Sequence, residues 1–177
     1  MKKHLFQKQG DTIIEVMFAT AVASLIIVMA MAVMNRGVAT TQMAVEHTFV
    51  RQGIDAQAES LRYFRDNKGV VGTNSTAATW SKIQTKTVSE ATPFGTCNSL
   101  SGQSFYIDLT TTGTNMIKNA SITPSGEIFA TPGRGMWIEA VTPSSAANYI
   151  DFHIRACWEP PFSGPKATLG TIVRLTK

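Results

Sequence analysis

The segment from Val16 to Met34 restricts the possible folds of this chain more than any other. It contains nineteen residues, none of them charged, and it begins close to Met1. About 20 apolar residues in an α-helix cross the hydrocarbon core of a bilayer, so this segment is long enough to span a membrane. We therefore expect a membrane-spanning helix near the N-terminus.

The residues before this span carry an unusual arrangement of charge. Lys2, Lys3 and Lys8 make the first ten residues basic, but the acidic residues Asp11 and Glu15 follow at the edge of the apolar run. The positive-inside rule predicts that the lysines keep the N-terminus in the cytoplasm. A carboxylate beside a span is costly to bury, so we expect Glu15 to have a partner.

Two simple interpretations of this region are a plain single-span anchor and a secretory signal peptide. The sequence Ala30-Met31-Ala32 even offers an A-x-A site of the kind that signal peptidase cleaves. A signal peptide, however, has an apolar region of 7–15 residues after a purely basic stretch. This apolar run is longer, and Asp11 and Glu15 interrupt the basic stretch, so the sequence favours a third interpretation.

The stretch Gly10-Asp11-Thr12-Ile13-Ile14-Glu15, followed by the uncharged run, resembles the prepilin leader of type IV pilins and of type II secretion pseudopilins. The resemblance implies that a membrane peptidase, which is also an N-methyltransferase, cleaves after Gly10 and frees the amine of Asp11. It also implies that Glu15 attracts the Asp11 amine of a neighbouring subunit during assembly. Asp11 departs from the family pattern, in which an apolar residue usually follows the cut. Because the peptidase mainly requires the glycine, cleavage is still expected.

The helix is predicted to continue beyond the span. After Asn35-Arg36-Gly37, apolar residues recur at spacings of three and four, as on one face of a helix: Val45, Phe49, Val50, Ile54, Ala58, Leu61 and Phe64. We expect the residues between them on a solvated or partner-facing side: Glu46, His47, Arg51, Gln52, Asp55, Glu59 and Arg62. Residues 66–69 supply a stop signal that ends in Gly69. One near-continuous helix from Asp11 to about Asp66 would extend about 84 Å at 1.5 Å per residue. Kinks are most easily placed at Gly37 and Gly53, each of which costs about 1 kcal/mol in a helix interior.

The C-terminal part has the patterns of strands and turns. Residues 70–102 predict a loop with one short helix or strand, anchored by Trp80 and Ile83. Strands are predicted over residues 104–109, 136–141, 149–158 and 168–175, with a hairpin formed by residues 121–123 and 127–129 around 124–126. In residues 149–158 apolar and polar side chains alternate, which predicts one buried and one polar face.

These elements predict an α+β fold in which a long N-terminal helix, its first half spanning a membrane, packs on a small antiparallel sheet. Pilin heads are similar. The expected organisation is a leader at 1–10, a membrane and assembly half of the helix at 11–35, an amphipathic half at 36–68, and a globular β-rich head at 69–177.

The two cysteines, Cys97 and Cys157, both follow the span and would be exported, into a setting where disulfides persist. Neither a CxxC motif nor a Cys/His cluster occurs, so we expect no metal site. A bridge between them would restrict the unfolded chain by roughly 4 kcal/mol in the loop-closure model. Two buried free thiols are the alternative. Because Cys157 falls on the polar side of its predicted strand, a bridge is expected near the surface.

The net charge of +4 is weak support for nucleic-acid binding. Removal of residues 1–10 takes three of the 16 basic side chains and no acidic one, which leaves 13 against 12. Bulk charge therefore offers little for an acidic polymer, and nucleic acid is not an expected partner.

Catalytic patterns are missing from the sequence. His4, His47 and His153 are far apart, and none of the metalloprotease, nucleotide-loop or nucleophile-elbow motifs occurs. Asp108, Glu139 and Asp151 lie in predicted strands, but a paired-carboxylate site needs two of them close together with one raised pKa. Trp137 and Trp158 are interpreted as core residues, and the glycines of Gly133-Arg134-Gly135 as providing backbone freedom in a turn. We expect neither an enzyme nor a cofactor.

The expected function is that of a structural subunit, a minor pilin or a pseudopilin, in a type IV pilus or a type II secretion-like filament. Its partners would be membrane lipid, the processing peptidase, other pilin or pseudopilin subunits and the assembly platform. The N-terminus would be cytoplasmic and the head exported, to the cell surface or periplasm after assembly. The alternatives are a non-polymerising, single-span, membrane-anchored exported protein and a head specialised for DNA uptake or adhesion.

Overall fold

The computed structural model describes residues 11–70, 72, 75–93, 97, 100–120, 130–144, 147–160 and 166–177, with the side chains of residues 11 and 12 excepted. Gly10 and the hairpin expected at residues 121–129 lie outside this part of the chain. Contacts divide the chain into two compact units, Met1–Gln42 and Met43–Lys177, each described by itself below.

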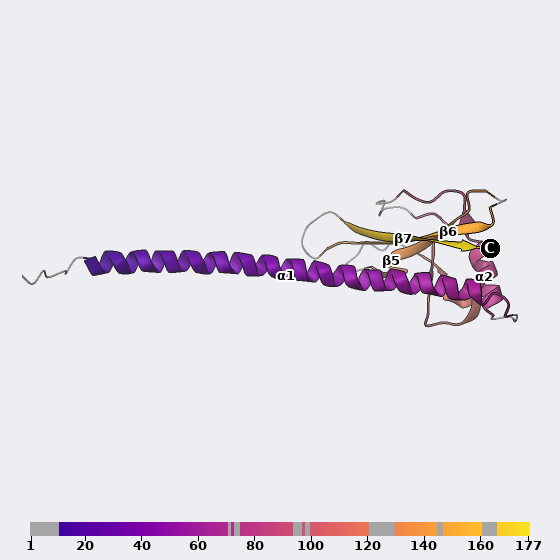
Figure 1. The fold of residues 1–177 in the computed structure, drawn as a ribbon, viewed down its shortest axis with the longest axis horizontal. Helices are drawn as coiled ribbons and strands as arrows, with labels where there is room; N and C mark the ends of the chain where they lie inside the picture. The colour runs from indigo at the N-terminus through magenta and orange to yellow at the C-terminus, as the bar shows by residue number, and fades with distance from the viewer. Residues whose placement is uncertain are drawn as a thin grey trace, which may run out of the picture. The chain divides into compact units, whose positions relative to one another are not determined.

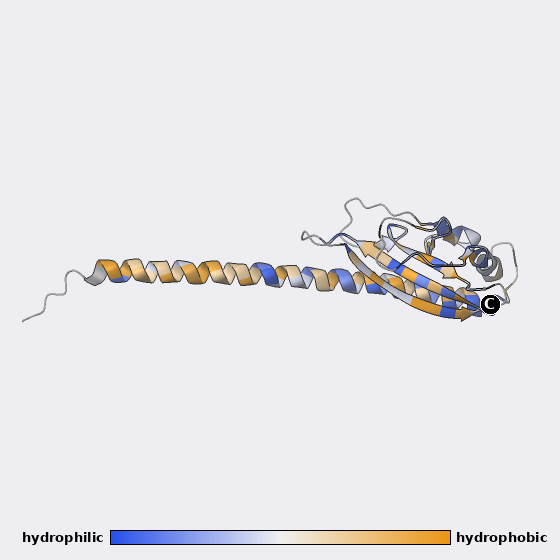
Figure 2. Ribbon diagram, turned by 90° about the horizontal axis from the view of Figure 1, so that it is seen from above, coloured by the Kyte–Doolittle hydropathy of each residue, from blue (hydrophilic) through white to orange (hydrophobic). Residues whose placement is uncertain are grey.

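The predicted long helix is present. Helix α1 (Asp11–Asp66) has 56 residues and passes through Gly37 and Gly53 without a break in its helical assignment. It ends at a turn over residues 67–69, where the Asn67 N–H donates to the Tyr63 carbonyl at 3.0 Å. The first part of α1 is apolar nearly all round, whereas polar and apolar residues intermingle in its second part (Figure 2).

In the second unit, one face of α1 packs on a sheet. The side chains of Val50, Ile54, Ala58, Leu61 and Phe64 are buried in the same core as the apolar residues of the sheet. This is the predicted stripe. At Gly53 a Cβ atom would lie 2.7 Å from Cε of Met136 in strand β5 (Gly135–Val141). Glycine at this position therefore allows the helix and the strand to approach closely.

The central strands form a sheet in the order β3-β2-β5-β6-β7, and every neighbouring pair on this path is antiparallel. Its members are β2 (Phe105–Ile107), β3 (Ile117–Asn119), β5, β6 (Tyr149–Trp158) and β7 (Ala167–Thr176). The last part of α1 runs along this sheet (Figure 1). Two-residue strands β1 (Thr87–Val88) and β4 (Thr131–Pro132) each pair in parallel with β5. The fold is thus α+β, with a helix on a small, mainly antiparallel sheet, in a pilin-like layout.

The long strands agree with the sequence predictions, and the short ones do not. Strand β6 covers the predicted residues 149–158. Strand β5 begins one residue earlier than predicted, and β7 is one residue longer than predicted at each end. Strand β2 is shorter than the predicted 104–109 because Asp108 begins a turn, in which its Oδ1 accepts from the Thr110 N–H at 2.9 Å. Asp108 therefore lies just outside the strand.

The stretch expected as a loop contains one short helix. Helix α2 (Thr76–Gln84) is capped by Ser75, whose side chain accepts from the Ala78 N–H, and it buries Trp80 and Ile83. A single 3₁₀ turn, η1 (Gly113–Met116), precedes β3. Strands β1, β3 and β4 were not predicted, because two or three residues are too few to show an alternation.

The two faces of the sheet are covered differently. The face toward α1 holds the main core, including Ile138, Phe152 and Ile154. On the other face Trp137 forms a small second cluster with Cys97 and Cys157. The prediction of one polar face for β6 is therefore only partly right, since Arg155 and Cys157 on that face are buried.

Candidate functional site

The membrane-side candidates begin at the start of α1. Asp11 is the first helical residue, and Glu15 lies one helical turn later with its side chain exposed. Among the described residues, the Glu15 side chain has no hydrogen-bond or ion-pair partner. The structure therefore presents Glu15 as an exposed carboxylate at the edge of the apolar run, and Gly10 lies outside the described residues.

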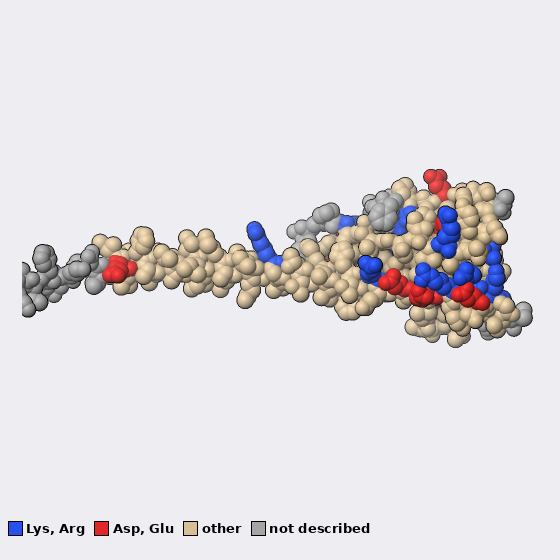
Figure 3. All heavy atoms as spheres, in the orientation of Figure 1, with Lys and Arg blue, Asp and Glu red and all other residues tan. Residues whose placement is uncertain are grey.

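The surface that follows Glu15 is uncharged and mainly apolar as far as Met34. From Ile13 to Val38 every side chain is exposed, including Phe18 at 72 % and Leu25 at 55 %. An 18-residue window of this helix has a mean hydropathy of 2.5, and it is the only described helix long and apolar enough to cross a membrane. Few charges lie on this part of α1, whereas Lys, Arg, Asp and Glu gather on the head (Figure 3).

The hydroxyl groups inside the apolar run are satisfied by the helix itself. Thr20 Oγ1 donates to the carbonyls of Val16 at 3.0 Å and Met17 at 2.9 Å, and Ser24 Oγ donates to Ala21 at 2.8 Å. In hydrocarbon an unsatisfied polar group costs several kcal/mol, so these internal bonds suit the segment to lipid. The expected single-pass anchor thus has a matching helix.

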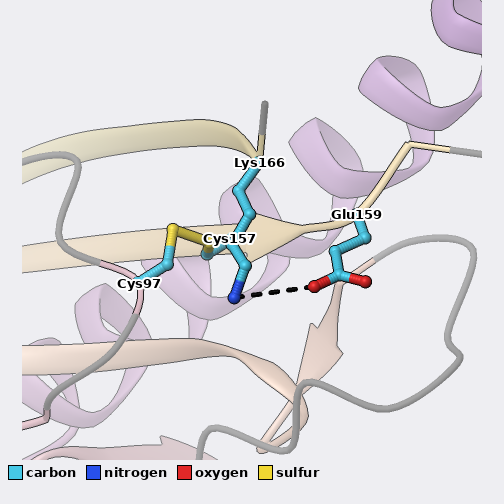
Figure 4. Close-up of a disulfide and its surroundings, with 4 residues drawn as sticks. All are labelled: Cys97, Cys157, Glu159 and Lys166. Atoms are coloured by element: carbon cyan, nitrogen blue, oxygen red, sulfur yellow. Dashed lines mark ion pairs between the residues drawn. A yellow bond between two sulfur atoms is a disulfide. The ribbon is translucent and has the colours of Figure 1, made fainter. Parts of the chain in front are cut away.

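The predicted disulfide is present in the head. Cys97 and Cys157 form a bridge with a Cα–Cα distance of 5.9 Å, which joins the loop before β2 to the end of β6 (Figure 4). Its expected place near the surface was wrong, because the cysteines are only 6 % and 7 % exposed and pack against Trp137. The loop that carries Cys97 covers this face of β6, which an alternation within one strand cannot reveal.

A buried ion pair holds the same loop. Glu139 is 1 % exposed; its Oε2 accepts from the Thr92 N–H at 3.0 Å and its Oε1 from the Thr92 hydroxyl at 2.6 Å. Arg155 donates to the Thr92 carbonyl and lies 3.6 Å from Glu139 Oε2. The two charges therefore bind both backbone groups of Thr92, and the pairing offsets the cost of burying them. Near the bridge, Lys166 and Glu159 form a more exposed pair at 3.6 Å.

The carboxylates considered for catalysis have separate basic partners. Asp108 pairs with Lys118, and this contact with the two Thr110 bonds lowers the pKa of Asp108 to about 2. Asp151 pairs with Arg174 at 2.7 and 2.8 Å, which lowers the Asp151 pKa. Glu139 binds Arg155 and Thr92. Neither Asp108 nor Asp151 has the raised pKa that a general acid requires.

His47, His153 and the turn at residues 133–135 were the other candidates considered for chemistry. His47 is exposed and meets the Trp158 ring edge-on at 5.2 Å. Burial and the nearby Arg155 guanidinium lower the pKa of His153. No group of three metal-ligating side chains occurs among residues that the structure describes. Gly133 and Gly135 have φ of +82° and +74°, and a Cβ at Gly135 would lie 2.5 Å from the Cys157 carbonyl oxygen, which supports the backbone interpretation.

Two polar residues of α1 have buried roles that the sequence analysis missed. Glu46 was expected on a solvated or partner-facing side, but it is 5 % exposed, and its Oε2 accepts from the Trp158 Nε1–H at 3.1 Å. Gln57 donates to the Ile107 carbonyl at 2.9 Å and accepts from the Ile107 N–H at 2.8 Å. Its position next to Ala58 in the apolar stripe was the one available signal.

None of the family models, curated proteins or solved structures compared with this chain matches it. The relation to pilins therefore stays a prediction that rests on the residues from Gly10 to Glu15.

Proposed function

We propose that this chain is a structural subunit, a minor pilin or pseudopilin, of a type IV pilus or type II secretion-like filament. The observation that carries the proposal is the arrangement at the N-terminal side of α1. A small residue, Gly10, precedes the first helical residue, a single carboxylate follows one turn later, and a wholly exposed apolar surface comes next.

The apolar surface of α1 needs a covering that the described residues do not provide. An apolar helix with internally satisfied hydroxyls is stable in lipid, and it is also stable among other helices of the same kind. A subunit that is first stored in the membrane and then assembled into a helical bundle uses the same surface twice. Residues such as Val16, Phe18, Val22, Leu25 and Ile26 would form the filament core.

Glu15 would direct the assembly. After cleavage behind Gly10, the new amine of Asp11 in one subunit would pair with Glu15 in its neighbour. Removal of one partner from a buried pair costs about 3–5 kcal/mol, so a subunit out of register would be strongly disfavoured. The described part of one chain contains no partner for Glu15, which suits a contact made between subunits.

The head suits an exported position. Disulfides persist in oxidising compartments, and in the sequence the cysteines of the Cys97–Cys157 bridge follow the span, whereas the lysines of the leader precede it. By the positive-inside rule the leader would remain cytoplasmic. The head would then be displayed on the outer side of the membrane and along the filament.

Cleavage is the first test. We expect the N-terminal mass spectrum of the membrane protein to begin at Asp11, and Gly10→Ala to leave the full-length chain in the membrane. Gly69→Ala is a suitable control, because Gly69 is exposed and a Cβ there meets no atom within 4 Å. An intact Met1 in most of the wild-type protein would remove the basis of the proposal.

Assembly is the second test. We expect Glu15→Leu to be inserted and cleaved normally, since the change makes the span more apolar. Its incorporation into filaments should fall at least about tenfold, because the amine loses its partner. Glu90→Leu, at an exposed head carboxylate, should leave incorporation unchanged. Wild-type incorporation of the Glu15 variant would show that Glu15 is not the assembly contact.

The candidate span alone also fits a membrane-anchored exported protein that does not polymerise. The two functions predict different N-termini, because the anchor has no need of cleavage behind Gly10. The mass spectrum described above therefore distinguishes them.

A further inference from the structure

One edge of the sheet in the head is long, regular and unpaired. Strand β7 ends the path β3-β2-β5-β6-β7, and it pairs with β6 along its whole length without a change of register. In an antiparallel pair, alternate residues of a strand bond to the neighbour, and the N–H and C=O groups of the residues between them point away. Among the described residues, no other strand and no backbone hydrogen bond reaches this outer side of β7.

The opposite edge of the sheet is protected, which makes the contrast informative. Strand β3 has only three residues, one of them Lys118, and the turn η1 leads directly into it. Proteins commonly prevent pairing at an edge with a very short strand, with lysine or proline, or with a bulge. Strand β7 has ten residues, includes neither lysine nor proline, and contains no bulge. The sheet therefore leaves one of its two edges free to pair.

The single charge of β7 does not guard this edge. The Arg174 guanidinium donates to Asp151 at 2.7 and 2.8 Å, and it lies 4.1 Å from the centre of the Tyr149 ring. Both partners belong to β6, so Arg174 is held toward β6 and away from the free side. On the same face of β7, Ile172 is 62 % exposed. An exposed apolar side chain on an edge strand offers a cross-strand contact to an added strand.

Basic side chains gather at the C-terminal end of β7. Arg65 Nη1 donates to the Thr176 hydroxyl at 3.5 Å, and Lys68 Nζ donates to the Lys177 carbonyl at 2.8 Å. Described basic side chains outnumber acidic ones there, four against two: Arg65, Lys68, Arg174 and Lys177 against Asp66 and Asp151. The sequence has no acidic residue from position 160 to position 177. The surroundings of this edge therefore favour an acidic partner.

We propose that the free edge of β7 binds an extended, acidic segment of a partner protein, which adds one more strand to the sheet. Backbone hydrogen bonds along residues 171–176 would hold the segment, and one of its apolar side chains would lie beside Ile172. A second copy of this chain is a poorer partner, because neither of its edge strands, β3 or β7, contains an acidic residue. The proposal concerns the head alone and depends neither on cleavage at Gly10 nor on filament assembly.

The test uses the full-length protein in neutral detergent micelles and a fluorescent ten-residue peptide. In the centre of the peptide threonine and valine alternate, and two glutamates stand at each end. We expect saturable binding by fluorescence anisotropy, with empty micelles as the blank. A peptide with lysines in place of the glutamates should bind at least about tenfold more weakly. Equal binding of the two peptides, or no saturable binding of the acidic one, would overturn the proposal.

Backbone methylation distinguishes strand addition from binding through side chains alone. An added strand uses the amides of one edge only, so a peptide that is N-methylated at alternate residues keeps one edge free. It should bind within about threefold of the parent peptide, whereas a peptide that is N-methylated at successive residues should bind at least about tenfold more weakly. Equal binding by all three peptides, or loss of binding by both methylated ones, would contradict the proposal.

Amide hydrogen exchange, followed by NMR, locates the added strand in the wild-type protein. Alternate amides among residues 171–176 should exchange at least about tenfold more slowly when the acidic peptide is bound, and the amides of β3 should be unaffected. Protection confined to any other segment would show that the peptide binds elsewhere.

A matched pair of substitutions tests the same place. Ile172→Asp should weaken binding of the acidic peptide at least about fivefold, because it puts a carboxylate beside the added strand. Leu109→Asp, at an apolar residue of similar exposure (59 %) outside the strands of the sheet, should leave binding unchanged. Thermal unfolding checks that both variants remain folded. Wild-type binding by Ile172→Asp would contradict the proposed contact.

Sedimentation of the protein in the same micelles tests the other occupant of the edge. We expect one protein chain per micelle, with or without the peptide. Self-association that the acidic peptide competes away would assign the edge to a second copy and overturn the proposal. N-terminal cleavage at Gly10 is measured separately, so the failure of one proposal leaves the other intact.

Discussion

The two parts of α1 share one backbone conformation and differ in what surrounds their side chains. Between Ile13 and Val45 all side chains are exposed except the half-buried Ala39, although most are apolar. From Glu46 to Phe64 buried residues recur every three or four positions and face the sheet. The first part has an apolar surface all round, as expected of a helix in lipid or among other helices. The second part is amphipathic, as expected of a helix on a core.

This comparison shows that one continuous helix presents two kinds of surface, which are suited to two kinds of surroundings. The second part of α1 is held by burial within its own chain. The first part has no such burial in the described structure, so its apolar surface requires surroundings other than the described residues of the chain. Substitutions at equivalent residues in the two parts should therefore affect different properties.

The largest expected effect is on membrane insertion. Leu25→Arg, near the middle of the span, should cost about 3 to 4 kcal/mol of insertion free energy. We expect the inserted fraction, measured by alkaline extraction of membranes, to fall at least about tenfold. Ile172→Arg, at a head residue that is 62 % exposed, should leave it unchanged. If both variants insert like wild type, the apolar part of α1 is not the anchor.

A matched pair of truncations compares the two parts directly. Leu61→Ala removes a side chain with 0 % exposure and should lower the free energy of unfolding of the head by about 2–5 kcal/mol. Leu25→Ala, at a residue that is 55 % exposed, should change it by less than about 0.5 kcal/mol. Urea unfolding of the full-length protein in micelles, followed by tryptophan fluorescence, reports on the head, where all three tryptophans lie. Equal effects of the two variants would contradict the division of the helix.

A polar contact of the second part should have a smaller effect. Gln57→Met keeps the length of the side chain but leaves the N–H and carbonyl of Ile107 unpaired. We expect a loss of about 2–4 kcal/mol, because each buried unsatisfied group costs about 1–3 kcal/mol. Gln52→Met, at an exposed position of the same helix, is the control and should be nearly neutral. The same denaturation experiment measures both, and a neutral Gln57 variant would show that water replaces the amide.

The smallest expected effect is a loss of stability of the head in acid. The Lys118 ammonium and the Thr110 bonds lower the pKa of Asp108 from 3.8 to about 2. Because the folded pKa is below the unfolded one, the contribution of Asp108 is complete above about pH 4 and is lost as the pH falls toward 2. Carboxyl NMR should show the titration of Asp108 moving toward 3.8 in Lys118→Met. An unchanged pKa in that variant would assign the shift to Thr110 alone.

Much of the architecture was predictable because it depends on local patterns. An apolar run predicts a span, spacings of three and four predict a helix face, and alternation predicts strands such as β6. The bounds of α1 and β6 agree with these predictions. In the candidate site, the sequence placed Glu15 at the edge of the apolar run and paired Cys97 with Cys157, because only two cysteines follow the span.

The sequence by itself determined the long helix, its division into an apolar and an amphipathic part, and the main strands of the head. Tertiary structure alone decided which polar residues are buried, because their partners are distant in the chain. Glu46 is buried where it accepts a hydrogen bond from Trp158, and Gln57 is buried where it bonds to the backbone of Ile107. Glu139 is buried where it binds Thr92 and pairs with Arg155. A periodic pattern indicates the side of a helix or strand on which a residue lies. It does not show which distant segment covers that side, and only packing in three dimensions decides this for Cys157.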